Sequence, residues 1–400
     1  MAAAEKMNPV RKYVLWLPLW YPNRMEPLSG DFIQRHAAAV ATLFPVKVIA
    51  MFRDKSLQKG QVTISKKISN NLEEWIIYYN SGNFKIRIAD RFFSFIRYTQ
   101  LFLQQIRALL REQGDPDLVH LHIYGKNCFI GFLLKILKGY PLAYMEQSTR
   151  FLSEEAADKF GRNGIDKFLL RMFSKQVAAS GFVSRYLADK VNRFASFYPF
   201  LVLPNVVDTK QFTISPKHDS PVQFVHVSLL DERKNISMIL EAAAILKNQN
   251  ENFRLILIGP VSEKVRHTVK RLELVSLVQL TGELDHPSVA RRIGESHALI
   301  LFSKAETFGC VIVEANACGV PVIVNDNPVM REVVEEEVTG FFASEETAAS
   351  LATVMTEFIK NPYPLDQIKV RNHTIQRYGI DVVALRFRDL YDLVLGGKSS

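Results

Sequence analysis

Short apolar runs alternate along the chain with longer segments in which apolar positions recur every three or four residues. The short runs predict buried strands of parallel sheets, and the longer segments predict the helices that connect them. In the first half we expect strands at residues 13–17, 46–51, 118–122, 141–145 and 181–184, and helices at 32–43 and 127–138. This alternation is typical of α/β proteins with doubly wound sheets.

The same alternation continues in the second half, after a turn at Pro204 and Asn205 that we interpret as the exit from a first domain. Strands are expected at residues 224–227, 254–258, 278–281, 298–302 and 322–324, and helices at 236–247, 309–318 and 381–395. A chain of 400 residues, 48% of them apolar, is long enough for two domains that each bury a core.

Residues 302–325 carry the strongest local signals. Gly309 breaks the chain after an apolar strand, and a helix follows. Gly319 suits a left-handed cap at the end of that helix, and Pro321 prevents its continuation. Glu306 lies just before the helix and Glu314 lies inside it, so their Cα atoms are separated by roughly 12 Å at the helical rise per residue. Two carboxylates at this spacing can hold two ends of one elongated ligand.

A helix N-terminus near Gly309 would bind a phosphate or diphosphate through its backbone amides. A carboxylate repels that anion, so Glu306 fits better beside neutral hydroxyls, and Glu314 would accept hydrogen bonds from a diol such as ribose. The pattern therefore indicates a nucleotide sugar. Two alternatives remain open. Glycosidase carboxylates would face each other at about 5–10 Å, or Glu306 caps the helix while Glu314 is solvated.

The segment resembles the signature of the retaining family-4 glycosyltransferases (glycosyl transferases group 1), in which a Glu, seven residues and a second Glu precede Ala-x-Ala-x-Gly-x-Pro-Val. Here the matching residues are Glu306, Glu314, Ala315, Ala317, Gly319, Pro321 and Val322. Further landmarks follow in family order at Trp20 to His36, Asp117 to His122, Leu203 to Asp208, and His226 to Ser228 with Lys234 and Asn235.

The resemblance implies an α/β GT-B fold with two doubly wound Rossmann-like domains facing across a cleft. It implies an N-terminal acceptor-binding domain at 1–206, a C-terminal nucleotide-sugar-binding domain at 207–377, and a crossover helix at 378–400 that returns to the first domain. The implied enzyme moves a sugar from a nucleoside-diphosphate donor to a hydroxyl acceptor with retention of configuration. Family members need no metal or other cofactor, because positive protein groups stabilise the departing diphosphate.

The resemblance also implies roles for individual residues. Lys234 would neutralise the diphosphate, and the adjacent Arg233 would replace a family arginine whose place Leu229 occupies. Gly30 would let a loop close over the donor phosphates. The remaining donor contacts would come from Phe308, Gly309 and Cys310.

Two segments depart from the family pattern. Gln147 stands where relatives carry a histidine beside the donor sugar, and Gln can hydrogen-bond to hydroxyls but cannot titrate. We still expect Gln147 to act with Glu306 and Lys234 as a catalytic residue. Residues 325–330 replace a Gly-Gly turn, so donor preference stays open. These departures favour one alternative from another class, a catalytically inactive module of the same fold that binds sugar nucleotides or glycans. An epimerase of this fold is a third.

The excess of positive charge is concentrated in the first half, where residues 1–200 hold 29 Lys and Arg against 16 Asp and Glu. No nucleic-acid motif accompanies this excess. A segment at 84–111 interleaves Arg87, Arg91, Arg97, Arg107 and Arg111 with apolar residues, as in helices that lie on anionic membranes. The alternative is a domain helix with solvated arginines. If the helix does lie on a membrane, the acceptor would be a hydroxyl compound such as a lipid-linked saccharide of bacterial surface-polysaccharide synthesis.

The cysteines do not suggest a disulfide framework, since Cys128, Cys310 and Cys318 are three in number and form no CxxC pair. His120 and His122 share one face of a strand, but no further metal ligand is evident near them, so a metal site is not expected. With no signal-peptide pattern or bilayer-spanning run either, we expect a cytoplasmic protein at the inner face of the plasma membrane.

Overall fold

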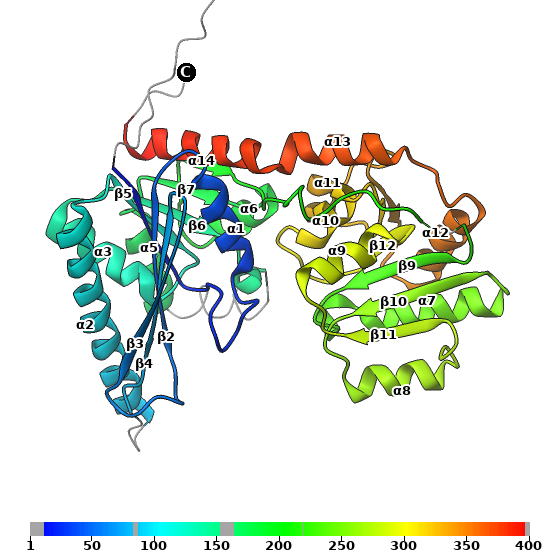
Figure 1. Ribbon diagram of the computed structural model, residues 1–400, viewed down its shortest axis with the longest axis horizontal. Coiled ribbons are helices and arrows are strands. Elements are labelled where there is room, and N and C mark those ends of the chain that lie inside the picture. The colour runs from blue at the N-terminus through cyan, green and yellow to red at the C-terminus, as the bar shows by residue number, and fades with distance from the viewer. Residues whose placement is uncertain (1–11, 83–86, 153–163, 218, 397–400) are drawn as a thin grey trace, which may run out of the picture. The chain divides into compact units, whose positions relative to one another are not determined.

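The computed structural model describes residues 12–82, 87–152, 164–217 and 219–396. The chain forms two units. The first comprises the described residues within 1–183, 187–204 and 383–400, and the second comprises 184–186 and those within 205–382. Each unit contains one sheet covered by helices (Figure 1). The α/β class and the two doubly wound Rossmann-like domains that the sequence predicts are therefore confirmed.

The first unit is built on an eight-stranded sheet in the order β3-β4-β2-β1-β5-β6-β7-β8. Its strands are β1 (Val14–Pro18), β2 (Val46–Arg53), β3 (Val62–Ser69), β4 (Leu72–Tyr79), β5 (Leu118–His122), β6 (Leu142–Glu146), β7 (Ala179–Phe182) and β8 (Phe200–Val202). Its helices are α1 (Asp31–Val40), α2 (Arg87–Gln113), α3 (Lys126–Lys138), η1 (Thr149–Phe151), α5 (Gly164–Ser174), α6 (Arg185–Asn192), whose first residues group with the second unit, and most of α14 (Ile380–Val394).

The hairpin of β3 and β4 adds an antiparallel edge that the hydrophobic pattern did not predict. Strand β3 lies at the edge of the sheet and exposes most of its side chains, including Lys66 and Lys67, so it lacks a continuous apolar run. A loop of Asn70 and Asn71 joins the two strands, and Asn70 adopts a φ of 51°. Polar turn residues of this kind are the signal that could have revealed the hairpin.

The order of the strands also places the helices. The connections from β4 to β5, from β5 to β6 and from β6 to β7 all run in one direction along the sheet. Right-handed crossovers therefore put α2, α3 and α5 on one face, while α1, which connects β1 to β2 in the opposite direction, covers the other.

The second unit has a six-stranded parallel sheet in the order β11-β10-β9-β12-β13-β14. Its strands are β9 (Val222–Val227), β10 (Phe253–Ile258), β11 (Val278–Gly282), β12 (Ala298–Leu301), β13 (Val322–Asn325) and β14 (Gly340–Ala343). Its helices are η3 (Glu232–Lys234), α7 (Ile236–Asn248), α8 (Glu263–Arg271), α9 (His286–Gly294), α10 (Cys310–Ala317), α11 (Pro328–Val333), α12 (Ala348–Lys360) and α13 (Gln367–Tyr378).

The last helix, α14, packs into the first unit. Tyr391 lies in the core, where its hydroxyl accepts a hydrogen bond from Nε1 of Trp16 at 3.2 Å and lies 3.0 Å from Nδ1 of His120. Phe387 is also fully buried there, against Trp16 and His36. In the part of the chain that the structure describes, none of the helices combines the length and the apolarity needed to cross a lipid bilayer.

Candidate functional site

The site in the second unit forms where the strand order reverses. Strand β9 pairs with β10 on one side and with β12 on the other, so the loops that follow β9 and β12 leave the same edge of the sheet. The backbone amide of Lys304 donates to the carbonyl of Arg233 at 2.9 Å and ties these two loops together. In open α/β sheets such a switch point is the usual place for a ligand.

Lys234 and Glu306 meet at this point. The Lys234 ammonium, at the end of the β9 loop, donates a hydrogen bond to Oε1 of Glu306, in the loop after β12. The Glu306 side chain is only 9% exposed and that of Lys234 is 23% exposed, so the pair is largely removed from water. Removing one partner of such a pair leaves an uncompensated charge, which is costly. The sequence predicted both residues for the site but not their contact.

The β9 loop is held in place by His226. Its Nδ1 donates to the carbonyl of Ile300 at 2.8 Å, and its Nε2 accepts from the hydroxyl of Ser228 at 2.7 Å. Burial lowers the pKa of His226 to about 4, although the hydrogen bond to the Ile300 carbonyl acts in the opposite direction, so the ring is neutral and has one donor and one acceptor. Ser228 Oγ in turn accepts from the amide of Leu230 at 2.9 Å. This series of hydrogen bonds orders the start of the loop that carries Lys234.

Gly259 allows the next loop to approach the same segment. Its φ is 143°, and a Cβ at this position would lie 1.8 Å from the carbonyl oxygen of Ser228. No other residue fits there without moving the backbone. The sequence interpretation named Ser228 as part of a family landmark but did not single out Gly259, although a glycine directly after a buried strand is a usable signal.

Helix α10 begins as the sequence predicts. Gly309 is its N-cap residue with a φ of 85°, and Gly319 follows the helix with a φ of 68°. The N-cap residue Gly309 has no side chain to cap α10, and Glu306 is paired with Lys234 instead of with the helix amides, so the alternative in which Glu306 caps this helix is wrong. Glu314 on α10 is 5% exposed, so the alternative of a solvated Glu314 is also wrong. The proposed contact of Glu314 with a ribose stays a prediction.

Three further predicted donor-binding residues surround these groups. Phe308 is buried, with its ring centroid 5.5 Å from that of Tyr378. Cys310 accepts a hydrogen bond at Sγ from Nδ2 of Asn205 at 3.1 Å. Arg233 is 60% exposed and pairs with Asp231, to which its Nε and Nη2 donate at 2.9 and 2.7 Å. Its predicted use as a phosphate ligand stays a prediction.

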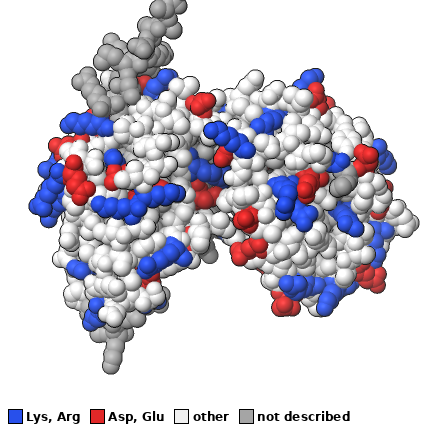
Figure 2. All heavy atoms as spheres, in the orientation of Figure 1, with Lys and Arg blue, Asp and Glu red and all other residues white. Residues whose placement is uncertain are grey.

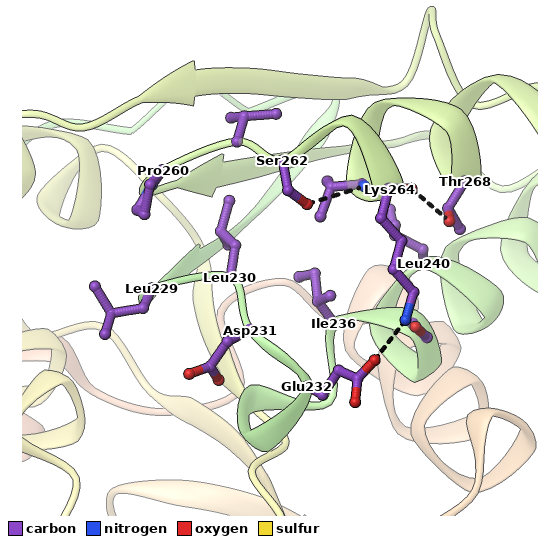
Figure 3. Close-up of a pocket in the computed structure, with 13 residues that line it drawn as sticks. Leu229, Leu230, Asp231, Glu232, Ile236, Leu240, Pro260, Ser262, Lys264 and Thr268 are labelled. Carbon is purple, nitrogen blue, oxygen red and sulfur yellow. Dashed lines mark hydrogen bonds and ion pairs between the residues drawn. The ribbon is translucent and has the colours of Figure 1, made fainter.

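A cavity of about 480 Å³ lies beside the β9 loop (Figure 3). Leu229, Leu230, Ile236 and Leu240 line it together with the loop after β10 and helix α8, and Lys264 reaches over to Glu232. None of the predicted site residues lines this cavity. Leu229, at the position of the missing family arginine, contributes an apolar side chain to it.

Residues 325–330, the second departure, form a capped turn. Asn325 donates through Nδ2 to the carbonyl of Ser303 at 3.1 Å, and Oδ1 of Asn327 accepts from the amide of Met330 at 3.0 Å as the N-cap of α11. Arg331 pairs with Asp326 at 2.8 Å. Side chains thus stabilise the turn where relatives use glycines.

Gln147 lies in the first unit, directly after β6, and its turn is fixed by a buried carboxylate. Glu146 is fully buried and accepts from the amides of Gln147 and Ser148 at 2.9 and 2.8 Å through Oε1. Its Oε2 accepts from the Tyr144 hydroxyl at 2.5 Å and from the amide of Tyr124 at 3.1 Å. The sequence interpretation missed Glu146, since nothing local distinguishes it from a solvated strand-end glutamate.

A neutral histidine orients the amide of Gln147. Burial lowers the pKa of His36 to about 4, and Nε2 of His36 lies 2.9 Å from the carbonyl oxygen of Pro204. That nitrogen therefore carries the proton, so Nδ1 accepts from Nε2 of Gln147 at 3.2 Å. His122, also fully buried, interacts with Gln147 as well, and burial lowers its pKa.

His120 and His122 lie side by side with ring centroids 4.1 Å apart. Within the described ranges, no cluster of three or more His, Cys, Asp or Glu side chains has a geometry that could hold a metal ion.

Gly30 has a structural reason to be glycine. It precedes α1 with a φ of 69°, and a Cβ would lie 2.6 Å from the carbonyl carbon of Trp20.

The predicted site residues are divided between the two units. The first unit holds Gly30 and Gln147, and the second holds Lys234, Arg233, Glu306, Phe308, Gly309, Cys310 and Glu314.

Part of the chain matches a known protein family. Residues 207–377 match the family model described as glycosyl transferases group 1. The chain is 27% identical over 276 residues to the amylovoran biosynthesis glycosyltransferase AmsK of Erwinia amylovora, an alignment that covers 64% of this chain and 65% of that protein. It is 21% identical over 278 residues to the alpha-D-kanosaminyltransferase of Streptomyces kanamyceticus, covering 65% of this chain and 72% of that one. The chain thus spans just under two thirds of the first of these relatives.

Solved structures resemble almost the whole chain. Sucrose-phosphate synthase from Thermosynechococcus elongatus aligns with a TM-score of 0.76 and 17% identity over 96% of this chain and 100% of that one. Anabaena HepE in complex with UDP and glucose aligns with a TM-score of 0.70 and 16% identity over 95% and 99%. At these identities the likeness establishes the fold, which is GT-B.

Proposed function

We propose, from the match of residues 207–377 to the glycosyl transferases group 1 family, that the chain is a glycosyltransferase that uses a nucleoside-diphosphate sugar as its donor. The observation that carries the proposal is the Lys234–Glu306 pair, which lies in the loops at the strand-order reversal, just before the N-terminus of α10. An ammonium group, a carboxylate and a helix N-terminus are thus gathered at one edge of the sheet.

In the proposed donor complex, Glu314 accepts hydrogen bonds from the ribose and the N-terminus of α10 faces the diphosphate. Lys234 neutralises the same diphosphate, and Glu306 accepts from hydroxyls of the sugar. Arg233, Gly30, Phe308 and Cys310 complete the donor contacts. This arrangement gives each charged group a partner of opposite charge or a neutral donor.

The proposed transfer proceeds with retention of configuration. The bond from the anomeric carbon to the diphosphate oxygen breaks as a new bond to the acceptor oxygen forms on the same face of the sugar. The acceptor proton passes to the departing diphosphate oxygen. Lys234 and the helix N-terminus stabilise the charge on that oxygen, so we expect no metal or other cofactor to be needed. Gln147 would hydrogen-bond to the sugar from the first unit, without taking a proton.

The acceptor is proposed to be a hydroxyl group, bound by the first unit, on a bacterial polysaccharide precursor or other glycoconjugate such as a lipid-linked saccharide. The Erwinia relative is named for amylovoran biosynthesis, which favours a polysaccharide precursor as the acceptor. Such an acceptor would bring the protein to the inner face of the plasma membrane. The donor base remains open among uridine, guanosine and adenosine, and the complex of HepE with UDP makes UDP the first to test.

A thermal-shift screen of UDP, GDP, ADP and their common sugar conjugates tests the donor site, because a ligand that binds only the folded state raises its stability. We expect one nucleotide to stabilise the protein. Incubation of the matching sugar nucleotide with hydroxyl acceptors should then give product, and NMR of its anomeric centre should show retention. An inverted product would contradict the mechanism. Stabilisation without transfer to any acceptor would instead indicate an inactive binding module.

A further inference from the structure

Three helices on one face of the first unit carry an unusual number of exposed apolar side chains. In the described part of the chain, 21 large apolar side chains are exposed, and ten of them lie on α2, α3 and α5. Single exposed apolar residues are normal, but a concentration of them marks an interaction surface. The ten are Phe92, Phe93, Phe95, Phe129, Ile136, Leu137, Ile165, Phe168, Leu169 and Met172.

Helix α5 is apolar on two of its sides. Leu170 and Phe173 point into the core and are buried. Ile165, Phe168, Leu169 and Met172 follow the spacing i, i+3, i+4, i+7, which places them on one stripe of the helix, and they are 76, 61, 48 and 40% exposed. A helix that only covers its own sheet needs the first side alone. The second stripe therefore calls for a partner outside the described part of this unit.

The apolar surface continues from α5 onto α3 and α2. Nζ of Lys135 on α3 donates at 2.6 Å to the carbonyl of Gln176, two residues beyond α5. Phe129 on α3 lies with its ring centroid 5.2 Å from that of Phe95 on α2. These contacts join the three helices into one outer layer, as the direction of their crossovers requires.

The same layer is strongly basic. The described side chains of the three helices include nine Lys and Arg and three Asp and Glu. Two of the three acids pair with cations of other elements, Asp90 with Arg53 at 3.1 Å and Glu112 with Lys66 at 3.8 Å. Lys and Arg are visible on the face of the first unit in Figure 2. Self-association through this face would bring like charges together, whereas an anionic partner would neutralise them.

We propose that the outer layer of α2, α3 and α5 docks on an anionic lipid bilayer, with the stripe of Ile165, Phe168, Leu169 and Met172 entering the boundary between head groups and acyl chains. Apolar residues combined with flanking cations are the features that bind such a surface. The sequence pattern suggested α2 alone. In the structure Leu101, Phe102 and Ile106 of that helix are buried, and the exposed stripe of α5 carries more of the surface. Residues 84–86 and the side chain of Arg87 lie outside the described residues.

Sedimentation of the full chain with vesicles tests the proposal, using pure phosphatidylcholine and its mixture with phosphatidylglycerol. We expect binding to the mixture that weakens as salt is raised. Phe168→Ser combined with Leu169→Ser should weaken this binding by at least about tenfold, since two large apolar side chains leave the boundary. Arg91→Glu combined with Lys138→Glu should weaken binding to the anionic vesicles by at least about tenfold.

The matched control is Val275→Ser combined with Ile368→Ser, which removes apolar side chains of similar exposure (67 and 63%) from the second unit. It should bind as the unchanged protein does. The proposal is overturned if the protein binds neither kind of vesicle, or if the variant with Phe168→Ser and Leu169→Ser binds as well as the control does. It is also overturned if sedimentation equilibrium shows a dimer that the same variant abolishes. The assay contains no sugar donor, so its result is independent of the proposed transfer.

Discussion

The Lys234 ammonium donates a hydrogen bond to the Glu306 carboxylate across 72 residues of chain, joining the loops after β9 and β12. Two groups proposed for different parts of one ligand therefore neutralise each other in this structure. Binding a diphosphate requires Lys234 to share its charge between Glu306 and the phosphate oxygens. Opposite effects on nucleotide binding are expected when the two residues are replaced separately.

Lys234→Ala should weaken binding of the nucleoside diphosphate and lower turnover by about 10²–10³-fold, because it removes charge stabilisation of the leaving group. Thermal shift with the nucleotide and product formation measure the two effects. Lys264→Ala is the control, since it breaks another Lys–Glu pair of the same unit, with Glu232, whose side chains are 69 and 82% exposed. Such pairs contribute little. Equal effects of both replacements would remove Lys234 from the site.

Glu306→Gln should lower turnover while nucleoside-diphosphate binding is kept or strengthened, because the amide no longer competes with phosphate for the Lys234 charge. The expected signature is a larger thermal shift with the diphosphate together with little sugar transfer. A variant that transfers sugar at the normal rate would show that Glu306 does not act on the donor.

Glu146→Gln should destabilise the first unit by about 1–3 kcal/mol, because an amide nitrogen would face donors that now reach a carboxylate oxygen. It should also reduce transfer through misplacement of Gln147. Urea unfolding measures the first effect, with Glu357→Gln, at an exposed position of α12, as a control expected to change stability by less than about 0.5 kcal/mol. If the two variants are equally stable, the contacts of Glu146 do not hold the turn.

Gly259→Ala should destabilise the second unit more than a positive φ alone explains, since the added Cβ meets the Ser228 carbonyl at 1.8 Å. Gly139→Ala provides the comparison, because Gly139 also has a positive φ of 74° but no atom within 4 Å of the added Cβ. The second change should cost about 1–2 kcal/mol. Similar unfolding midpoints for the two variants would contradict the close approach to Ser228.

Stability should decrease as the pH falls below neutrality. Burial lowers the pKa of His36 and His226 to about 4 and that of His120 to about 3. The unfolded chain binds protons at these residues near the ordinary value of 6.5, so their contribution is complete above that pH and is lost as the pH falls towards 4 and 3. At pH 5 each of these histidines should lower the free energy of unfolding by about 2 kcal/mol relative to its value above pH 6.5.

Urea unfolding at pH 7 and pH 5 measures this loss. His36→Gln should reduce the difference between the two pH values, although it lowers stability at pH 7. His267→Gln, at an exposed position, should leave the difference unchanged. A pH dependence that is the same in both variants would mean that His36 does not couple folding to protonation.

The sequence by itself determined the strand–helix alternation and a helix, expected at 309–318, with glycines at both ends, whereas the residues of the candidate donor site came largely from the resemblance to a family. Periodicity, positive φ at glycine and the break at Pro321 act over a few residues, so they can be read locally. The polar edge strand β3 was not predicted, because it has no continuous run of buried apolar residues.

Only the tertiary structure decided which groups meet and which stay exposed. The pairing of Lys234 with Glu306, the four donors around Glu146 and the close approach of Gly259 to Ser228 all join segments that are distant in sequence or whose contacts depend on neighbouring strands. The apolar residues of α5 look alike in sequence, but Leu170 is buried and Phe168 is 61% exposed. Burial and pairing depend on what packs against a residue, and that is fixed only when the strands are assembled into their sheets.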